Sequence, residues 1–480
     1  MIKVTEWLDS LANKNAVLTD FSGASIIEVS YKEFMNCVSE TAMEWSKLGV
    51  VAGSTVLLSL PSHLSLLIHT LALVKLGAAP APISNHLTGE TFRHICHTVQ
   101  PCAILSTQAK MEQSLITEFE VKSARFAVFH PLKLFVRKNR AINSSLENCC
   151  ILSTTGSTGL PKSVVHASSS LLQNALLHMN EIDKHEGGSY IASLPIFYSY
   201  GLVAGVLGAL SKGKNIYFPE QPFYPRGWFD LCEQQNISLA SITPSLLKRL
   251  LATDRIFPST LRKLTIGGDL SDQEDLEQLQ AVYSGDIYLT YGLSEAGPRV
   301  MTQKLKKNYT AEQGVPMGRP LSGIELKLDD AYSIDGDEYG ELWVKTPTAM
   351  LGYLQDKQFR RDDFNGEWLR TGDIVRRTKG LEQDVFFVER KKNIIVSGGE
   401  KLYPGIIRNV LLQHPLVVEA MIFSLPSERW GNVPAAAIKL VSEAAENELP
   451  LILEWCKSRL RGIETPHKLV IEKDLIVSKK

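Results

Sequence analysis

Residues 154–162 are the part of this sequence whose side chains are best suited to chemistry, and they read Thr-Thr-Gly-Ser-Thr-Gly-Leu-Pro-Lys. Hydroxyl groups donate hydrogen bonds, glycines let backbone N–H groups approach a ligand closely, and the final lysine adds a positive charge. We therefore expect a loop that wraps a polyphosphate. The residues just before it, 149–152, form a short apolar run typical of a buried strand, after which phosphate-binding loops begin. The expected phosphate-binding residues are Thr154, Thr155, Gly156, Ser157, Thr158, Gly159 and Lys162.

A Walker-type loop is the first alternative for this segment. Such a loop requires Gly, four residues and then Gly-Lys-Ser/Thr, whereas residues 156–163 read Gly-Ser-Thr-Gly-Leu-Pro-Lys-Ser. Pro161 has no N–H to donate and a fixed φ, so it interrupts the row of backbone donors that a Walker loop needs. The other alternative is an ordinary Ser/Thr/Gly surface turn, which the loop by itself leaves open.

A second candidate group, Tyr-Gly-Leu-Ser-Glu at residues 291–295, directly follows the apolar run at 287–289. This places it at the carboxyl end of a predicted strand, where α/β sheets bind their ligands. Tyr291 offers a flat face for a base, Ser294 a hydroxyl for a phosphate, and Glu295 a hard oxygen ligand for Mg²⁺. Taken alone, the pentapeptide is also compatible with any exposed turn.

A third candidate group begins at Thr371-Gly372-Asp373. An aspartate beside a glycine can accept two hydroxyl hydrogen bonds, as a ribose diol requires, although an isolated motif of this kind is more often a simple turn. Arg390 lies 17 residues further on, and a glycine-containing segment at 394–404 follows it. The three features together favour a binding role.

In order and spacing, these segments resemble the motifs of the adenylate-forming superfamily, which contains acyl-CoA synthetases, coumarate ligases, carrier-protein-loading adenylation domains and firefly luciferase. The resemblance covers roughly residues 31–475 and includes matching signatures at 314–320 and 340–342. It implies catalytic roles for Lys162, Ser294, Glu295 and Lys480, and Mg²⁺ binding by Glu295. It further implies ATP binding by residues 154–159 with Gly268, Asp269, Tyr291, Gly292, Asp373 and Arg390, a hinge at Lys392, and a thiol-site loop with Gly398 and Gly399.

The resemblance also implies two half-reactions. A carboxylate attacks the α-phosphate of Mg·ATP to give an acyl-adenylate and pyrophosphate, and a small domain then rotates about the hinge and presents a pantetheine thiol. The acceptor is either coenzyme A or the phosphopantetheine of an acyl or peptidyl carrier protein. Basic residues at 457–461 would suit both, or form an ordinary solvated face. The leading hypothesis is thus an AMP-forming acid–thiol ligase. The alternative is a catalytically impaired homologue that binds nucleotide or acyl-adenylate in a regulatory or scaffold role.

The expected acid site departs from the usual family pattern. Where acyl- and aryl-CoA synthetases have Pro-x-Phe-His, this sequence has Tyr198 in place of the histidine, followed by Ser199. Neither position carries the aspartate that pairs with an α-ammonium in amino-acid-activating domains, which favours a hydrophobic or aromatic acid. Asp269 stands where small residues are usual, so the adenine-side wall is more polar. The expected acid pocket comprises Tyr198, Ser199, Gly267 and Gly297.

The C-terminal lysine motif departs most from the superfamily pattern. Superfamily members carry a Pro-x-x-x-x-Gly-Lys segment whose lysine contacts the acid and AMP, whereas residues 470–475 resemble only the strand that leads to it. The sequence then reads Ile-Val-Ser-Lys-Lys at 476–480. Three interpretations stay open: Lys480 or Lys479 replaces the missing lysine through a shortened loop, adenylation is slow without it, or both lysines are merely solvated.

The composition is that of a soluble globular protein. The 480 residues are 44% hydrophobic and carry a net charge of −1, which permits more than one domain and disfavours nucleic acid as a partner. Seven cysteines without paired spacing predict reduced thiols. The N-terminus lacks a signal-peptide pattern, and polar residues and a proline interrupt the most apolar stretch, 56–82. We therefore expect a cytoplasmic protein without a transmembrane segment.

Short apolar runs alternate with helical patterns up to about residue 300, and this rhythm predicts an α/β fold with largely parallel sheets. Helices are expected at 31–48 and 64–76, and strands at 56–60, 103–105, 190–192, 264–266 and 287–289. Alternating residues in 323–389 predict antiparallel strands of a small β-barrel-like part. We expect a large N-terminal domain at 1–389 for ATP and acid, a hinge at 390–392, and a small mobile α+β domain at 393–480, shortened at its end. In that domain, helices are expected near 404–413 and 449–461, with strands at 417–424 and 435–440.

Overall fold

The computed structural model describes residues 3–22, 26–61, 63–87, 89–106, 118–124, 126, 133–138, 142–154, 160–306, 315–334, 336–379, 384–441 and 448–472. Its chain divides into two compact units. Unit 1 comprises Met1–Glu325 and Val344–Leu369, and unit 2 comprises Leu326–Trp343 and Arg370–Lys480. The expected division at 389 and 392 stays a prediction.

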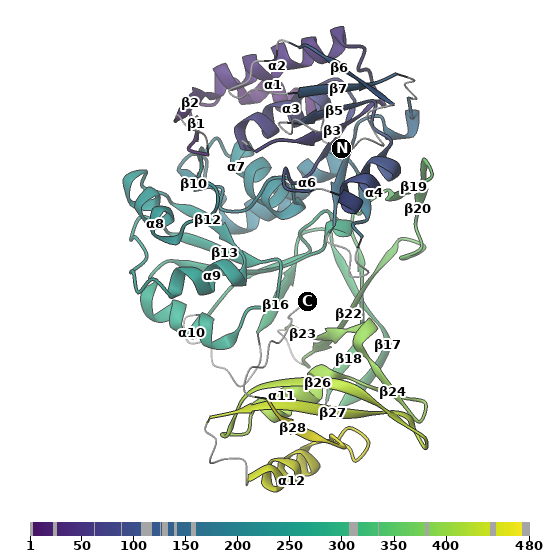
Figure 1. Ribbon diagram of the computed structural model, residues 1–480. Helices are drawn as coiled ribbons and strands as arrows, with labels where there is room; N and C mark the ends of the chain where they lie inside the picture. The colour runs from purple at the N-terminus through teal and green to yellow at the C-terminus, as the bar shows by residue number, and fades with distance from the viewer. Residues whose placement is uncertain are drawn as a thin grey trace. The chain divides into compact units, whose positions relative to one another are not determined.

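Helix α2 (Tyr31–Lys47) shows why the expected helices form where they do. The Ser30 hydroxyl accepts a hydrogen bond from the Glu33 N–H (3.2 Å), and the Glu33 carboxylate accepts one from the Ser30 N–H (2.8 Å). This capping box fixes the first turn, and Gly49, at φ +79°, lies just beyond the last one. Helices α1 (Val4–Leu11), α2 and α3 (His63–Lys75) lie side by side in Figure 1. The helices expected at 31–48 and 64–76 are confirmed.

A five-stranded sheet with the order β4-β3-β5-β7-β6 forms the first layer of strands in unit 1. Strand β3 pairs in parallel with β4 and β5, while β7 pairs antiparallel with β5 and β6. Every residue of β3 is buried, which explains the apolar run expected as a strand at 56–60. The bounds are β3 Thr55–Ser59, β4 Ala79–Pro82, β5 Ala103–Ser106, β6 Phe119–Lys122 and β7 Lys133–Arg137.

The main sheet of unit 1 runs in the order β16-β15-β14-β13-β12-β10-β11-β1-β2. Its central pairs, from β14 to β1, are parallel. The bounds are β1 Val17–Asp20, β2 Ile27–Ser30, β10 Ser189–Ile191, β11 Asn215–Phe218, β12 Leu239–Ile242, β13 Lys263–Gly267, β14 Asp286–Tyr291, β15 Met301–Lys304 and β16 Pro316–Pro320. Strands β10, β13 and β14 occupy the expected runs. The α/β class predicted from the sequence is therefore confirmed.

Helices join these strands and cover them with apolar side chains. Leu247 of α9 and Leu276 of α10 are fully buried in one core with residues of β12, β13 and β14. The bounds are α4 Gly89–Val99, α6 Ser168–Ile182, a π-helical segment η2 Tyr200–Leu207, α7 Gly208–Ser211, α8 Pro225–Gln234, α9 Pro244–Leu251 and α10 Gln273–Val282. Short 3₁₀ turns lie at η1 Ser144–Leu146, η3 Ser294–Ala296 and η5 Lys391–Asn393. Among the helices that the structure describes, none is long and apolar enough to cross a membrane.

A small antiparallel sheet, β20-β19-β9-β8, brings together parts of unit 1 that are far apart in sequence. The bounds are β8 Cys149–Ser153, β9 Ser163–Ala167, β19 Gly352–Gln355 and β20 Gln358–Arg360. Strand β8 is the apolar run expected before the phosphate loop. Because β19 pairs with β9, the segment 344–369 reaches the base of that loop.

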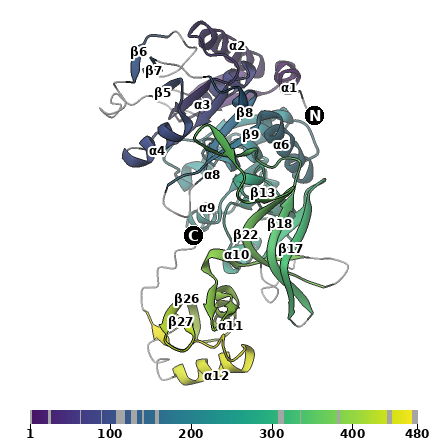
Figure 2. The same cartoon turned by 90° about the vertical axis from the view of Figure 1, so that its right-hand side faces the viewer.

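Unit 2 contains antiparallel strands followed by a layer of helices on a three-stranded sheet. Strand β22 pairs antiparallel with β23. Helix α11 packs on β26 (Figure 2). The strand bounds are β17 Glu325–Ile334, β18 Asp337–Lys345, β22 Trp368–Arg377, β23 Val385–Arg390, β24 Ile395–Ser397, β25 Glu400–Leu402, β26 Val417–Ser427, β27 Gly431–Leu440 and β28 Leu469–Ile471. Strand β21 Phe364–Asn365 belongs to unit 1 and pairs with the first residues of β22. The helices are α11 Pro404–Leu412 and α12 Leu449–Arg459. The helices and strands expected after residue 400 are confirmed.

Candidate functional site

The two ends of the expected phosphate loop are held together by the β8–β9 hairpin. Ser153 pairs with Ser163, and the Thr154 N–H donates to the Lys162 carbonyl oxygen (3.0 Å). Lys162 leaves this base with its side chain half exposed, so its ammonium group is available to a ligand. The remaining loop residues of the prediction, Thr155, Gly156, Ser157, Thr158 and Gly159, lie outside the described residues.

The loop with Ser294 and Glu295 follows β14, as expected, and a buried histidine fixes its backbone. The His166 ring donates from Nε2 to the Ser294 carbonyl oxygen (2.7 Å). Burial lowers the pKa of His166 to about 4, so the ring is neutral at physiological pH. The Met350 N–H donates to the Glu295 carbonyl oxygen (2.8 Å). The carboxylate of Glu295 therefore projects from a backbone that is held from two sides.

Two expected sites meet at a pair of hydroxyl groups. The oxygen of Ser199, expected in the acid pocket, lies 2.8 Å from the oxygen of Ser294, expected at the phosphate. Ser199 is buried, whereas its neighbour Tyr198 exposes 41% of its surface. Because an acid must meet the α-phosphate for adenylation, this junction is a suitable place for the two substrates to join.

Tyr353 links two acids beside Lys162. Its hydroxyl oxygen lies 2.8 Å from Glu295 Oε1 and 2.8 Å from Asp363 Oδ2. The Lys162 ammonium stands 4.2 Å from the centre of the Tyr353 ring and 3.8 Å from Asp363 Oδ2. Burial, together with the two nearby acids, raises the pKa of Tyr353, so the phenol keeps its proton.

These residues suit a magnesium ion that arrives with a nucleotide. In the described part of the chain, no group of three or more His, Cys, Asp or Glu side chains could hold a metal by itself. Mg²⁺ commonly binds through one or two carboxylates together with substrate phosphates and water. Glu295 can supply such a carboxylate, and Lys162 lies close enough to the same cluster to neutralise phosphate charge.

Close packing explains the glycines of the expected acid and adenine sites. A Cβ atom on Gly267 would lie 2.1 Å from the Thr290 hydroxyl oxygen, and one on Gly292 would lie 1.7 Å from the Pro298 carbonyl oxygen. Gly268 follows β13, and Gly297 follows η3. The backbone therefore approaches its neighbours too closely for a side chain at Gly267 or Gly292.

The side chains of the expected adenine wall differ in exposure. Tyr291 is half-buried at the end of β14, whereas Asp269 is exposed, and its carboxylate accepts a hydrogen bond from the Leu270 N–H (2.8 Å). Asp269 is therefore open to solvent, as a polar wall requires.

Arg299 is a buried cation in this region that the sequence analysis missed. Its guanidinium donates to the Thr290 hydroxyl (2.8 Å) and stacks 3.9 Å above the Tyr200 ring, and the residue is only 2% exposed. Asn174 of α6 binds both backbone polar groups of Arg299 (2.8 and 2.9 Å). The only sequence signal was its place four residues after the Tyr-Gly-Leu-Ser-Glu motif.

In unit 2, Asp373 and Arg390 lie opposite each other on β22 and β23, and Arg390 Nη1 is 2.8 Å from Asp373 Oδ1. Their separation of 17 residues is thus that of facing positions in a hairpin. Lys392 is exposed in η5, and Gly398 and Gly399 form the exposed turn between β24 and β25. Lys479 and Lys480 lie outside the described residues.

With this geometry established, a comparison with protein-family models decides the family. Residues 5–354 match the model described as AMP-binding enzyme. The chain belongs to the AMP-binding enzyme family. The matched range includes the phosphate loop, Glu295 and Tyr353, so unit 1 of this AMP-binding enzyme carries most of the family pattern.

Several curated relatives of this AMP-binding enzyme are 2-succinylbenzoate–CoA ligases. The protein of Bacillus licheniformis is 30% identical over 320 residues, which cover 66% of this chain and 64% of the relative. The protein of Bacillus pumilus is 27% identical over 440 residues, which cover 91% and 88%. The prediction of an AMP-forming acid–thiol ligase is confirmed at the level of the family and these relatives.

Solved structures agree on the fold. The o-succinylbenzoate coenzyme A synthetase of Bacillus subtilis in complex with its acyl-adenylate intermediate superposes with a TM-score of 0.77 at 21% identity, covering 98% of this AMP-binding enzyme and 94% of that chain. The same synthetase in complex with ATP and magnesium ion gives 0.75 at 21% identity, covering 98% and 96%. The predicted fold class is therefore confirmed over nearly the whole chain.

Tyr353 and Asp363 escaped the sequence analysis for a different reason from Arg299. Tyr353 lies 58 residues after Glu295, and its hydrogen bond to Glu295 depends on the pairing of β19 with β9. No local pattern of residues encodes that pairing. Only the folded chain shows that the glutamate and the loop lysine share a tyrosine.

Proposed function

We propose that this enzyme joins an aryl acid of the 2-succinylbenzoate type to coenzyme A at the expense of ATP. The observation that carries the proposal is the 2.8 Å contact between Ser199 and Ser294, because it brings the expected acid and phosphate sites together. The names of the curated relatives support the choice of acid and acceptor.

The chemistry follows from the side chains at this junction. A carboxylate oxygen of the acid attacks the α-phosphorus of ATP, the bond to the pyrophosphate oxygen breaks, and an acyl-adenylate forms. In this proposal Lys162 stabilises the charge that develops on the departing pyrophosphate, and the Ser294 hydroxyl orients the phosphate. Mg²⁺, when bound at Glu295, would neutralise further phosphate charge. The thiol then attacks the acyl carbon, and AMP leaves.

The names of the relatives favour coenzyme A over a carrier protein as the acceptor, whereas the basic residues around α12 are compatible with both. Lys457 pairs with Glu454 (2.6 Å), the Arg459 guanidinium stacks on the Trp455 ring (3.3 Å), and Arg461 pairs with Glu464 (2.8 Å). These cations keep their charge in such exposed contacts, so the face of α12 would suit either the phosphates of coenzyme A or an acidic carrier protein.

The predicted domain division belongs to the same proposal. Rotation of residues 393–480 about Lys392 would exchange the adenylation and thiol-transfer states, and the exposed position of Lys392 supports a hinge there. A Lys392→Pro variant should keep pyrophosphate release but lose thioester formation. We propose a cytoplasmic location, which fractionation of the source cells would test.

Pyrophosphate release with Mg·ATP and a panel of acids tests the activity. The panel would contain 2-succinylbenzoate, benzoate, a cinnamate and a medium-chain fatty acid, with hydroxylamine to trap the activated acid. We expect release only with an aryl acid and thioester only after coenzyme A is added. If a thioester formed with a holo-carrier protein and not with coenzyme A, the carrier protein would be the acceptor. ATP binding without turnover of any acid would favour the regulatory or scaffold alternative.

A further inference from the structure

Strand β19 and the residues just before it contact two parts of the expected phosphate site: β9, which follows Lys162, and the loop that carries Glu295. Tyr353 is paired with Val164 of β9, two residues beyond Lys162, and the Leu351 N–H donates to the Val165 carbonyl oxygen (2.8 Å). One residue earlier, Met350 binds the Glu295 backbone (2.8 Å). Residues 350–353 therefore fix the distance between the lysine strand and the glutamate loop.

The hydroxyl of Tyr353 stands between two acceptors. A phenol has one proton, so it can donate to Glu295 or to Asp363 at any moment but not to both. Both oxygen–oxygen distances are 2.8 Å. Two carboxylates thus share one proton, and a cation near the cluster would relieve the repulsion between them.

The ring of Tyr353 holds the only cation that the described residues place beside these acids. The Lys162 ammonium lies 4.2 Å from the ring centre, within the range of a cation–π contact, and 3.8 Å from Asp363. The side chains of Lys162 and Asp363 are 50% and 40% exposed, so solvent and ligands can reach the cluster. One charge of Lys162 does not balance two carboxylates.

We propose that Tyr353 is a positioning residue that uses its hydroxyl to orient Glu295 toward a phosphate-bound divalent cation and its ring to orient Lys162 toward the same phosphates. This inference rests on the proposed function, since it assumes Mg·ATP as the ligand. It assigns separate tasks to two parts of one side chain, and these can be removed one at a time.

Calorimetric titration of ATP into the full-length protein, with Mg²⁺ and with EDTA, tests the assignment without any need for turnover. Tyr353→Phe keeps the ring and removes the hydroxyl. Because a hydrogen bond to a charged group is involved, we expect about a 10-fold weaker affinity in Mg²⁺ and no change in EDTA. Tyr353→Leu also removes the ring face, so its affinity in EDTA should fall about 3-fold as well.

Tyr224→Phe is the matched control, because Tyr224 is 61% exposed at the start of α8, and it should behave like the wild type. Circular dichroism and the unfolding midpoint would establish that each variant is folded. Equal losses for Tyr353→Phe in Mg²⁺ and in EDTA, or no loss in either, would overturn the positioning role. A wild-type chain that binds Mg·ATP normally but activates no acid would overturn only the proposed function, whereas one that binds no ATP would overturn both.

Discussion

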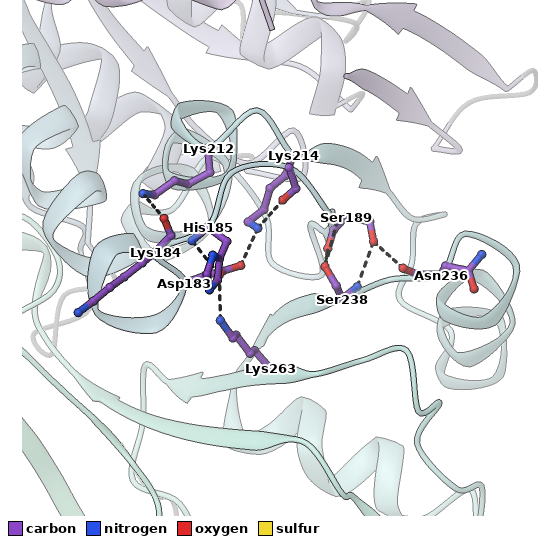
Figure 3. A network of polar contacts seen from close by, with 10 residues as sticks. Asp183, Lys184, His185, Ser189, Lys212, Lys214, Asn236, Ser238 and Lys263 are labelled. Atoms are coloured by element: carbon purple, nitrogen blue, oxygen red, sulfur yellow. Dashed lines mark hydrogen bonds and ion pairs between the residues drawn. The ribbon is translucent and has the colours of Figure 1, made fainter. Parts of the chain in front are cut away.

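The two edges of the parallel sheet in unit 1 carry polar clusters of opposite character. At the amino ends of β10, β11, β12 and β13, Asp183 accepts from Lys214 (2.7 Å) and Lys263 (2.8 Å), and Lys214 also donates to the Gly187 carbonyl oxygen (2.7 Å) (Figure 3). At the carboxyl ends lie Ser199, Ser294 and Glu295. The first cluster is closed, since the Lys214 side chain is 1% exposed and bonds to Asp183 and to the Gly187 carbonyl oxygen. The second is less enclosed, since Ser294 and Glu295 are only half-buried.

This difference indicates that the amino-edge cluster stabilises the fold, whereas the carboxyl-edge cluster is suited to chemistry. A buried ammonium must be paired, because its desolvation is costly, and the amino edge meets that requirement with groups of the protein itself. At the carboxyl edge, two carboxylates share one phenolic proton and a half-exposed lysine. Charged side chains that lack a full counter-charge within the protein can interact with a charged substrate. Variants at the two edges should therefore fail in different assays.

Removal of the buried lysine should give the largest effect. Lys214→Met leaves the buried Asp183 carboxylate with only Lys263 and the His185 N–H as partners, and we expect the free energy of unfolding to fall by about 3–5 kcal/mol. Urea denaturation would measure this loss. Lys184→Met is the matched control, since Lys184 is exposed and its side chain points away from Asp183 in Figure 3. An equal loss in both variants would contradict the special role of the amino edge.

Removal of the loop lysine should give the reverse pattern. Lys162→Ala deletes the charge that we propose to stabilise the phosphates, so kcat for pyrophosphate release should fall by about 10²–10³-fold. The unfolding free energy should change by less than about 0.5 kcal/mol, because the side chain is half exposed. A Lys162→Ala variant with a clearly lower free energy of unfolding and an unchanged kcat would contradict the distinction between the two edges.

Strong acid should weaken the amino edge. Burial acts to raise the pKa of Asp183, but hydrogen bonds and charge from Lys214 and Lys263 outweigh it and lower the pKa from 3.8 to about 2. A depressed carboxyl pKa stabilises the fold above pH 4, and this contribution, about 2 kcal/mol, is lost as the pH falls from 4 to 2. The stability difference between wild type and Asp183→Asn should therefore shrink over that range. If the difference in unfolding free energy stayed constant from pH 4 to pH 2, the pKa of Asp183 would not be lowered in the folded protein.

A matched pair of serine variants should give the smallest effects. Ser189 donates to the Asn236 carbonyl oxygen (2.6 Å) at the amino edge, and Ser199 contacts Ser294 (2.8 Å) at the carboxyl edge. Ser189→Ala should cost about 1 kcal/mol of unfolding free energy with unchanged kcat/KM. Ser199→Ala should lower kcat/KM for the acid about 5-fold with little change in stability. If both variants changed the same property, either the free energy of unfolding or kcat/KM, the comparison of the two edges would be contradicted.

The sequence predicted the carboxyl edge far better than the amino edge. Apolar runs located β10, β13 and β14, and the residues that follow such runs carried recognisable motifs, as Tyr291 and Glu295 do. Asp183 lies 31 and 80 residues from its two lysines, and each of the three stands alone before or at the start of a strand. Their pairing results from strand order, which local patterns do not encode. The same reason hid Tyr353.

The placement of β19 also dictates when the site can form during synthesis. The chain leaves unit 1 after Glu325 and returns at Val344, so the strand that carries Tyr353 is made long after β9, its partner. A nascent chain that ends at residue 343 already contains Lys162 and Glu295 but lacks the tyrosine that joins them. The ribosome must release the first segment of unit 2 before unit 1 can close its loop-bearing sheet. If Tyr353 has the proposed role, a chain that ends before β19 should bind Mg·ATP more weakly than the full-length protein.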